Sequence, residues 1–239
     1  MHLAPEKEGD LVFNEGEVPA GSTETVYGLD GQAFEAESQK EPSPLKGEAY
    51  DGPHLVEVVR YVPDIVLDIQ YATTDSFTGQ AVYPDARAFL IKDAVCALVK
   101  VQENLKQQGY RLKLFDAYRP LSVQKLFWKI LPDPRYVANP KVGSRHNRGY
   151  AVDVSLVSLQ GAEIPMPTQY DDFSERAHSN CASLPEEAIK HREVLHQAMK
   201  KHGFESLASE WWHFDYSGWE ARPVLDIEFD GIPPTRCAL

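Results

Sequence analysis

Basic residues are scarce in this sequence. Its 239 residues include 24 Lys and Arg against 36 Asp and Glu, which gives a formal net charge of −12 at pH 7. Nucleic acids and anionic membrane surfaces attract proteins through clustered Lys and Arg side chains. The charge therefore argues against both kinds of partner, whereas a small zwitterionic or cationic ligand is compatible with it.

Cysteine is also scarce, and long apolar runs are missing. The three cysteines, Cys96, Cys181 and Cys237, are widely spaced and form no C-x-x-C pair, which disfavours a disulfide framework and a thiolate zinc site. One disulfide stays open as an alternative to free thiols. No apolar run has the length of a membrane span, and the first residues contain no apolar signal core. We expect a cytoplasmic protein as the chain stands, or an exported one whose signal was removed; no pattern indicates an oligomeric state.

The first fifty residues differ in composition from the rest. Residues 1–50 contain eleven Asp or Glu and three Lys or Arg, a net charge of −8, interspersed with Gly, Pro, Ser and Thr. This composition is typical of a solvated tail. We expect residues 1–50 to be an acidic, mostly irregular extension and residues 51–239 to be one domain, because 43% hydrophobic residues can supply a core.

The spacing of apolar residues predicts both strands and helices after residue 50. Alternation predicts strands over 64–71, 110–119, 149–159 and 210–216, and helical spacing predicts helices over 91–108, 121–131 and 183–202. Strands and helices do not alternate regularly enough for a doubly wound sheet, which favours an α+β fold. Smaller expectations concern a capping box at Ser183 and Glu186, a buried Cys96, and solvent-facing or last-turn positions for His191, His196 and His202.

Two short segments contain the residues of a metal site. Residues 144–153 include His146 and Asp153, and residues 210–214 include His213. Catalytic zinc takes three protein ligands from His, Asp or Glu and keeps one position open. Each residue alone fits a structural role better, as a core histidine or as half of a buried ion pair. Their combination favours one catalytic zinc ion (Zn²⁺) per chain.

A further carboxylate completes the predicted chemistry. Glu210 is our candidate for the general base, which takes a proton from a zinc-activated water and hands it to the leaving amine. Trp211 and Trp212 are expected to form apolar walls that exclude bulk water. Asp116 and Arg119, at the end of a predicted strand, taken alone fit a surface ion pair better than a site.

The motifs Ser144-x-His146-x-x-Gly149-x-Ala151-x-Asp153 and Glu210-x-Trp212-His213 together resemble those of the zinc D-Ala-D-Ala peptidases. That family includes VanX-type dipeptidases and VanY-type carboxypeptidases. Three further matches resemble the VanX-type D-alanyl-D-alanine dipeptidases: Y-A-T-x-D-x-F-T-G over 71–79, D-x-Y-R-P over 116–120 and M-P-x-x-Y-D-x-F over 166–173. The resemblance covers roughly residues 62–216 in the family's order, and residues 1–50 find no counterpart there.

The resemblance implies a fold, an activity and a set of residue roles. The implied fold is α+β, with a central, mostly antiparallel sheet flanked by helices and the zinc site at one end of the sheet. The implied activity is zinc-dependent hydrolysis of D-alanyl-D-alanine, or a similar short D,D-dipeptide, to free amino acids. The implied roles are zinc binding by His146, Asp153 and His213, acid/base catalysis by Glu210, oxyanion binding by Arg119, orientation of Arg119 by Asp116, ammonium binding by Asp171 and Tyr71, and contact with the substrate carboxylate by Ser144.

Two departures from the dipeptidases and two other functions stay open. Ser76 stands where the dipeptidases carry Asn, and Pro167 stands where they carry Gly, so the dipeptide preference is not determined. One alternative is a D,D-carboxypeptidase or endopeptidase that acts on larger peptidoglycan peptides and needs no acid for a free amine. The other is a zinc-binding protein without turnover, which the presence of Glu210 and Arg119 disfavours. The sequence does not separate a role in glycopeptide resistance from one in wall recycling.

Overall fold

The computed structural model describes residues 26–27, 33–34 and 54–233 of the chain. The chain divides into two units, residues 1–46 and 47–239. In the first unit, β1 (Val26–Tyr27) pairs with β2 (Ala33–Phe34) in antiparallel register. The remainder of the predicted extension over residues 1–50, and Cys237, lie outside the described residues, so the predicted domain division stays a prediction.

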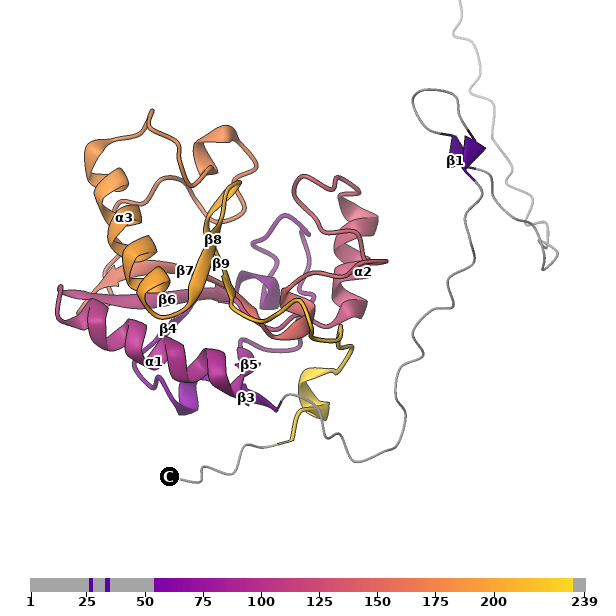
Figure 1. Ribbon diagram of the computed structural model, residues 1–239, viewed down its shortest axis with the longest axis horizontal. Helices are drawn as coiled ribbons and strands as arrows, with labels where there is room; N and C mark the ends of the chain where they lie inside the picture. The colour runs from indigo at the N-terminus through magenta and orange to yellow at the C-terminus, as the bar shows by residue number, and fades with distance from the viewer. Residues whose placement is uncertain (1–25, 28–32, 35–53, 234–239) are drawn as a thin grey trace, which may run out of the picture. The chain divides into compact units, whose positions relative to one another are not determined.

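A five-stranded sheet lies at the centre of the second unit (Figure 1). Its order is β4-β6-β7-β9-β8, and every neighbouring pair is antiparallel except β4 and β6. The strands are β4 (Val66–Leu67), β6 (Tyr110–Asp116), β7 (Ala151–Ser158), β8 (Phe204–Leu207) and β9 (Glu210–Tyr216). A separate antiparallel pair is formed by β3 (Leu55–Glu57) and β5 (Phe89–Ile91). The predicted α+β class with a mostly antiparallel sheet is confirmed.

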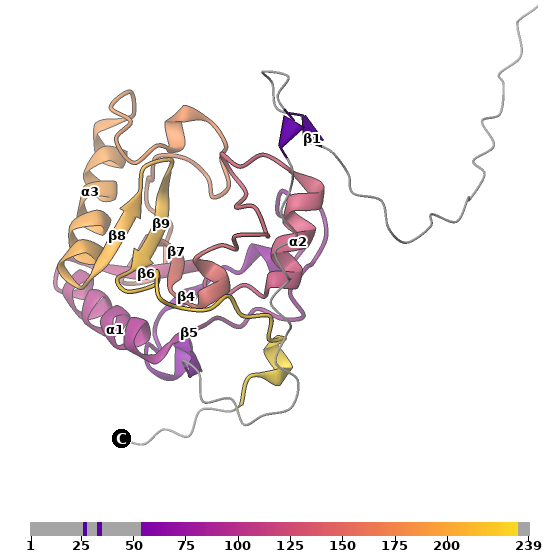
Figure 2. The ribbon, with the colours of Figure 1, turned by 45° about the vertical axis from the view of Figure 1, so that its right-hand side comes forward.

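Helices flank this sheet. Helix α1 (Lys92–Lys106) and helix α3 (Glu186–Lys201) pack against each other, α1 also against β6 and α3 against β8. Helix α2 (Leu121–Ile130) lies apart from both in Figures 1 and 2. The apolar residues of α1 that recur at helical spacing are buried, so tertiary packing holds that helix in place.

Most predicted elements are confirmed, and the strand predicted over residues 64–71 is largely wrong. Only β4 pairs with a neighbour there, and Gln70–Ala72 form a 3-10 turn. Ile69 and Tyr71 are nevertheless buried. The alternation therefore identified which side chains enter the core, whereas strand formation also needs a partner strand along the whole segment.

Three local predictions are wrong. No side chain caps α3, which begins after Pro185, so the capping box expected from Ser183 does not form; the proline's φ of −54° itself suits a helix start. Cys96 is exposed, because it lies on the solvent side of α1. His191 is buried, and its Nδ1 lies 2.7 Å from a backbone carbonyl oxygen of the preceding loop.

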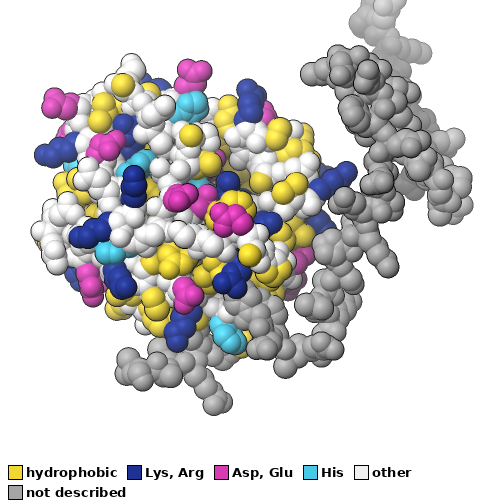
Figure 3. Space-filling model, viewed as in Figure 1, with side chains coloured by type: hydrophobic (Ala, Val, Ile, Leu, Met, Phe, Trp, Pro, Cys, Tyr) yellow, Lys and Arg dark blue, Asp and Glu magenta, His cyan; other side chains and the backbone are white. Residues whose placement is uncertain are grey.

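The surface carries charges of both signs. Lys and Arg side chains are scattered among acidic and neutral ones on the face shown in Figure 3. In the part of the chain that the structure describes, no helix combines the length and the apolarity that a membrane crossing requires.

Candidate metal centre and active site

Three neighbouring strands place polar side chains in one row across the sheet. Asp116 of β6 is the register partner of Asp153 in β7, and Asp153 is the partner of His213 in β9. Such partners lie directly opposite each other, with their side chains on the same face. The three residues are only 1%, 3% and 5% exposed, respectively. Burial of this much polarity is stable only if each group has a partner.

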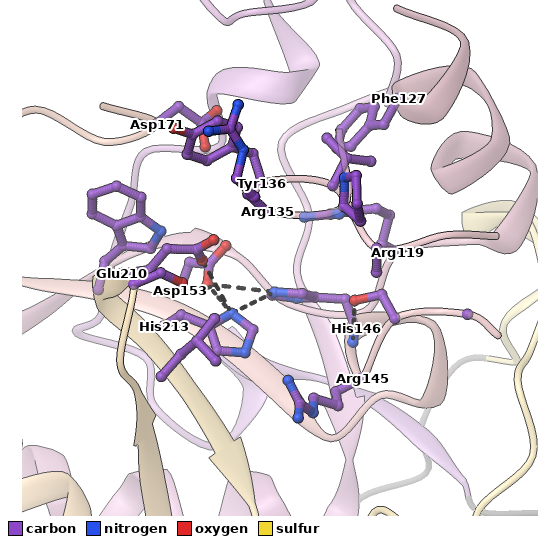
Figure 4. A pocket seen from close by; sticks show the side chains of 18 of the residues that line it. Arg119, Phe127, Arg135, Tyr136, Arg145, His146, Asp153, Asp171, Glu210 and His213 are labelled. Atoms are coloured by element: carbon purple, nitrogen blue, oxygen red, sulfur yellow. Dashed lines mark hydrogen bonds and ion pairs between the residues drawn. The ribbon is translucent and has the colours of Figure 1, made fainter. Parts of the chain in front are cut away.

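His146 reaches this row from the short turn His146–Arg148 before β7 (Figure 4). Its Nε2 lies 3.4 Å from Asp153 Oδ1 and 3.1 Å from His213 Nδ1. Its other nitrogen, Nδ1, lies 2.7 Å from a carbonyl oxygen at the end of β6, and His213 Nε2 lies 3.0 Å from Asp215 Oδ1. These outer acceptors take the ring N–H groups. When the imidazoles are neutral, the two nitrogens that face each other, His146 Nε2 and His213 Nδ1, therefore carry lone pairs.

The facing atoms fit a metal ion. Asp153 Oδ1 lies 3.0 Å from His213 Nδ1, so the three separations are 3.0, 3.1 and 3.4 Å. Tetrahedral zinc with N and O ligands at about 2.0–2.2 Å spaces those ligands roughly 3.3–3.6 Å apart, so the separation of 3.4 Å lies within that range and the other two are about 0.2–0.3 Å shorter. Among the described residues, His146, Asp153 and His213 form a converging group of this kind. The structure thus brings together the three ligands predicted from the sequence.

Electrostatics favour a cation between these groups. Burial alone raises the pKa of Asp153, but the two neighbouring imidazoles outweigh it and hold that pKa well below its usual range. Burial lowers the pKa of His213, but hydrogen bonds with Asp153 and Asp215 outweigh it and raise the pKa to about 10. Both shifts favour positive charge between His213 and Asp153, the place that a metal ion would take.

Glu210 lies beside this group without belonging to it. Its Oε2 is 3.7 Å from His213 Nδ1, and its side chain is 20% exposed. Burial raises the pKa of Glu210, whereas His213 opposes the shift. Trp212 lines, as predicted, the cavity into which Glu210 also faces. Trp211 does not line it, and its indole N–H donates to Thr168 Oγ1 at 2.9 Å.

Arg119 is buried behind the metal group, so its interpretation as half of a surface ion pair is wrong. Its Nη2 and Nε donate to Asp116 Oδ2 at 2.6 and 3.0 Å, and its Nη1 donates to Gln124 Oε1 at 2.8 Å. Burial lowers the pKa of Arg119, but Asp116 outweighs it and raises that pKa well above its usual range. Three of the five guanidinium N–H groups are thus engaged, which leaves two for an oxygen in the cavity.

Asp171 and Tyr71 form a further polar pair. The Tyr71 hydroxyl donates to Asp171 Oδ2 at 2.8 Å. Asp171 is the non-glycine residue of the described chain with a positive φ, +57°, a conformation that Asp tolerates better than most residues. Burial raises the pKa of Asp171 to about 8, and the hydrogen bond from Tyr71 opposes this shift. Within residues 54–233 no Lys or Arg forms an ion pair with it, so the carboxylate is suited to an external cation.

One cavity of about 370 Å³ joins these groups. Figure 4 shows Glu210, Asp153 and His213 facing His146, with Asp171 and Arg119 beyond them. Apart from Asp116, which lies behind Arg119, the predicted site residues all line the cavity: Tyr71, Arg119, Ser144, His146, Asp153, Asp171, Glu210 and His213. The sequence motifs therefore converge on a single site.

The turn that carries His146 is built by its neighbours. Ser144 Oγ accepts the His146 N–H at 3.2 Å, and Asn147 Oδ1 accepts the Ser144 N–H at 2.6 Å. Gly149 has a φ of +68°, and a Cβ atom there would lie 2.6 Å from Leu55 Cδ2. Glycine is required at this position because a side chain would meet both a strained backbone and the core.

Four residues that contact the site were not predicted: Tyr83, Gln124, Tyr170 and Asp215. The Tyr83 hydroxyl donates to Asp116 Oδ1 at 2.7 Å, and Gln124 holds Arg119. Asp215 had a signal, because a residue two positions after His213 on one strand shares its face. Tyr170 also had a signal, because it is the tyrosine of the motif matched over 166–173, although no role was predicted for it. Tyr83 lies in a loop, whose course no local pattern determines.

A family model described as D-Ala-D-Ala dipeptidase matches residues 51–227. The chain belongs to this family of M15 peptidases. It is 37% identical over 179 residues to the D-alanyl-D-alanine dipeptidase of Escherichia coli K12, which covers 75% of this chain and 93% of the relative. The D-alanyl-D-alanine dipeptidase of Streptomyces coelicolor is 33% identical over 190 residues, 71% of this chain and 93% of that protein. The D-alanyl-D-alanine dipeptidase of Enterococcus faecium is 32% identical over 171 residues, which cover 62% of this chain and 83% of that protein.

Two solved structures to which this M15 peptidase is similar have lower sequence identities. The LD-carboxypeptidase LdcB is 20% identical, with a TM-score of 0.41 and coverage of 72% of each chain. A D,D-pentapeptidase, VanY from a vancomycin resistance cassette, in complex with Zn(II), is 16% identical, with a TM-score of 0.36 and coverage of 56% of this chain and 76% of that one. Family membership confirms the sequence-based assignment and the expected enzyme class, a metallo-dipeptidase.

Proposed function

We propose that residues 51–239 form a zinc-dependent dipeptidase that hydrolyses D-alanyl-D-alanine, or a similar short D,D-dipeptide, to free amino acids. The observation that carries the proposal is the His146, Asp153 and His213 group, whose facing atoms lie 3.0–3.4 Å apart next to the separate Glu210 carboxylate. The three dipeptidase relatives support the substrate class.

The metal group and Glu210 divide the chemistry between them. One zinc ion held by His146, Asp153 and His213 would supply Lewis-acid polarisation of the peptide carbonyl and of a water molecule. Glu210 accepts the proton of that water and delivers it to the nitrogen of the leaving amino acid. Burial raises the pKa of Glu210, which suits both steps, since an acid/base catalyst works best with a pKa near the working pH.

Arg119 stabilises the charge that develops on the carbonyl oxygen. Its guanidinium is fixed by Asp116 and Gln124 before substrate arrives. Donors that are already oriented cost no reorganisation during the reaction, and they act more strongly in a site that excludes water. Ser144, which lines the same cavity, would contact the substrate carboxylate.

Asp171 favours a dipeptidase over an enzyme that trims longer chains. With Tyr71 it offers a carboxylate to a free ammonium group. A longer peptide carries an uncharged amide at that position, and an amide cannot form an ion pair with Asp171. A D,D-carboxypeptidase or endopeptidase is therefore the second candidate, and the amine end of the substrate distinguishes the two.

Substrate comparison tests this proposal. Zinc-loaded protein is expected to release alanine from D-Ala-D-Ala, but not from N-acetyl-D-Ala-D-Ala or a peptidoglycan pentapeptide, and a chelator should abolish release. Alanine is quantified in parallel reactions at equal protein and zinc concentrations. Release from the blocked or longer substrates would instead assign the carboxypeptidase activity, and stoichiometric zinc without any release would indicate a binding protein.

Asp171→Asn is expected to raise KM for D-Ala-D-Ala about 10- to 100-fold with a smaller change in kcat. A hydrogen bond to a charged group contributes about 1.5–3 kcal/mol, and the substitution removes the charge but keeps the shape. Steady-state kinetics of the zinc-loaded variant measure this. The matched control is Asp172→Asn, because the Asp172 side chain accepts the Ser174 N–H and does not line the cavity. An unchanged KM in Asp171→Asn would reject the assigned ammonium contact.

A further inference from the structure

The two carboxylate oxygens of Asp153 have different partners. Oδ1 faces the two imidazole nitrogens, at 3.0 Å from His213 Nδ1 and 3.4 Å from His146 Nε2. Oδ2 accepts a hydrogen bond from the Tyr170 hydroxyl at 2.9 Å. The oxygen that does not face the metal position is therefore held by a side chain from the loop after β7.

The ring of Tyr170 is fixed by its packing. It is buried and stacks on Phe115 with ring centroids 4.5 Å apart and an interplanar angle of 13°. Trp212 forms a T-shaped contact with it, with ring centroids 5.5 Å apart and an interplanar angle of 74°. Aromatic contacts on two sides leave the hydroxyl little freedom, so its direction toward Asp153 is set by the fold.

The Tyr170 hydroxyl also lies 3.3 Å from the Tyr71 hydroxyl, which donates to Asp171. A phenol has a single proton and can donate it to one acceptor at a time. The Asp153 oxygen is nearer and carries charge, and hydrogen bonds to charged acceptors are shorter and stronger. We therefore place the Tyr170 proton on the bond to Asp153.

We propose that Tyr170 is a positioning residue for the metal, which holds Asp153 as a ligand through Oδ1 alone. The inference rests on the proposed zinc site. A carboxylate can bind a metal ion through one oxygen or through both. With the Tyr170 hydroxyl on Oδ2, Asp153 supplies one ligand atom and a coordination position stays open for the reaction. Without that hydroxyl, Oδ2 can turn inward and occupy the open position.

Tyr170→Phe tests the proposal because it removes the hydroxyl and keeps the ring. Zinc affinity is measured by competition with a chromogenic chelator. Partners that orient a metal ligand typically contribute about 10- to 100-fold in affinity, so the dissociation constant is expected to rise by up to that factor, because binding through the second oxygen offsets part of the loss. The matched control is Tyr118→Phe, which also removes a hydroxyl that is hydrogen-bonded, to the Ile227 carbonyl oxygen at 3.1 Å and the Ile227 N–H at 2.8 Å, on a buried residue that does not line the cavity. Its zinc affinity should change less than twofold.

Cobalt substitution gives a second reading that a purely structural role would not change. The visible absorption of Co(II) weakens as its coordination number increases, so cobalt-loaded Tyr170→Phe should absorb less than wild type, whereas Tyr118→Phe should match wild type. An unchanged zinc affinity and cobalt spectrum in Tyr170→Phe would overturn the inference and leave the proposed function standing. A wild-type protein that binds no zinc would overturn both.

Discussion

Glu210→Gln is expected to lower kcat for D-Ala-D-Ala by two to four orders of magnitude, with zinc still bound. A positioned general acid/base contributes about 10²- to 10⁴-fold, equivalent to about 3–5 kcal/mol of transition-state stabilisation. Glu210 lies outside the group of converging metal ligands, and its Oε2 is 3.7 Å from His213 Nδ1, so the substitution removes the proton carrier and no ligand atom. Glu210→Ala should give a loss of similar size.

The measurement pairs turnover with metal content. kcat is determined under saturating substrate, and bound zinc is quantified by elemental analysis of the same preparation. Glu205→Gln is the matched control, since Glu205 is an exposed residue of the neighbouring strand β8 and should retain wild-type kcat. Loss of zinc from Glu210→Gln would show that Glu210 is a ligand, and near-normal turnover would remove it from the mechanism.

His213→Ala is expected to weaken zinc binding by about 10²- to 10³-fold and to abolish turnover at limiting zinc. Four-ligand zinc sites contribute about 10–16 kcal/mol, so one ligand corresponds to roughly 2.5–4 kcal/mol. His213 occupies the centre of the group, with its Nδ1 3.0 Å from Asp153 and 3.1 Å from His146. Competition with a chelator measures the loss. The control is His196→Ala, because His196 does not line the cavity and its Nε2 lies 2.9 Å from the Trp211 carbonyl oxygen. Full zinc occupancy in His213→Ala would exclude His213 as a ligand.

The pH dependence of zinc binding follows from the same residue. Hydrogen bonds with Asp153 and Asp215 outweigh burial and raise the pKa of His213 to about 10, so zinc must displace one proton below that pH. Apparent zinc affinity of the wild type should therefore increase up to about tenfold per pH unit between about pH 6 and 9. In the zinc-free protein the raised pKa gives stability that is complete below about pH 6.5 and is lost as the pH rises through about 10. Chelator titrations and thermal unfolding across this range check both trends, and a flat affinity profile would contradict them.

The local spacing of apolar residues correctly predicted the elements that pack one regular apolar face into the core. Helix α1 and strands β6, β7 and β9 were predicted because their apolar residues recur with a single period and enter one core. The segment over 64–71 failed because Ile69 and Tyr71 are buried without strand pairing. Alternation of apolar and polar residues indicates which side chains are buried, and buried side chains in a loop can give the same sequence pattern as those in a sheet.

The sequence by itself determined which residues could carry the proposed chemistry of this protein. The motifs contain His146, Asp153, His213 and Glu210, and zinc chemistry restricts what such residues can do together. Only the tertiary structure decided their geometry. The register of β6, β7 and β9 sets Asp116, Asp153 and His213 in one row. The Ala117 carbonyl oxygen orients the imidazole of His146, and the Asp215 carboxylate orients that of His213. Tyr170 and Gln124 joined the site only through loop and helix placement, because contacts between residues far apart in the chain arise from packing, which no local periodicity encodes.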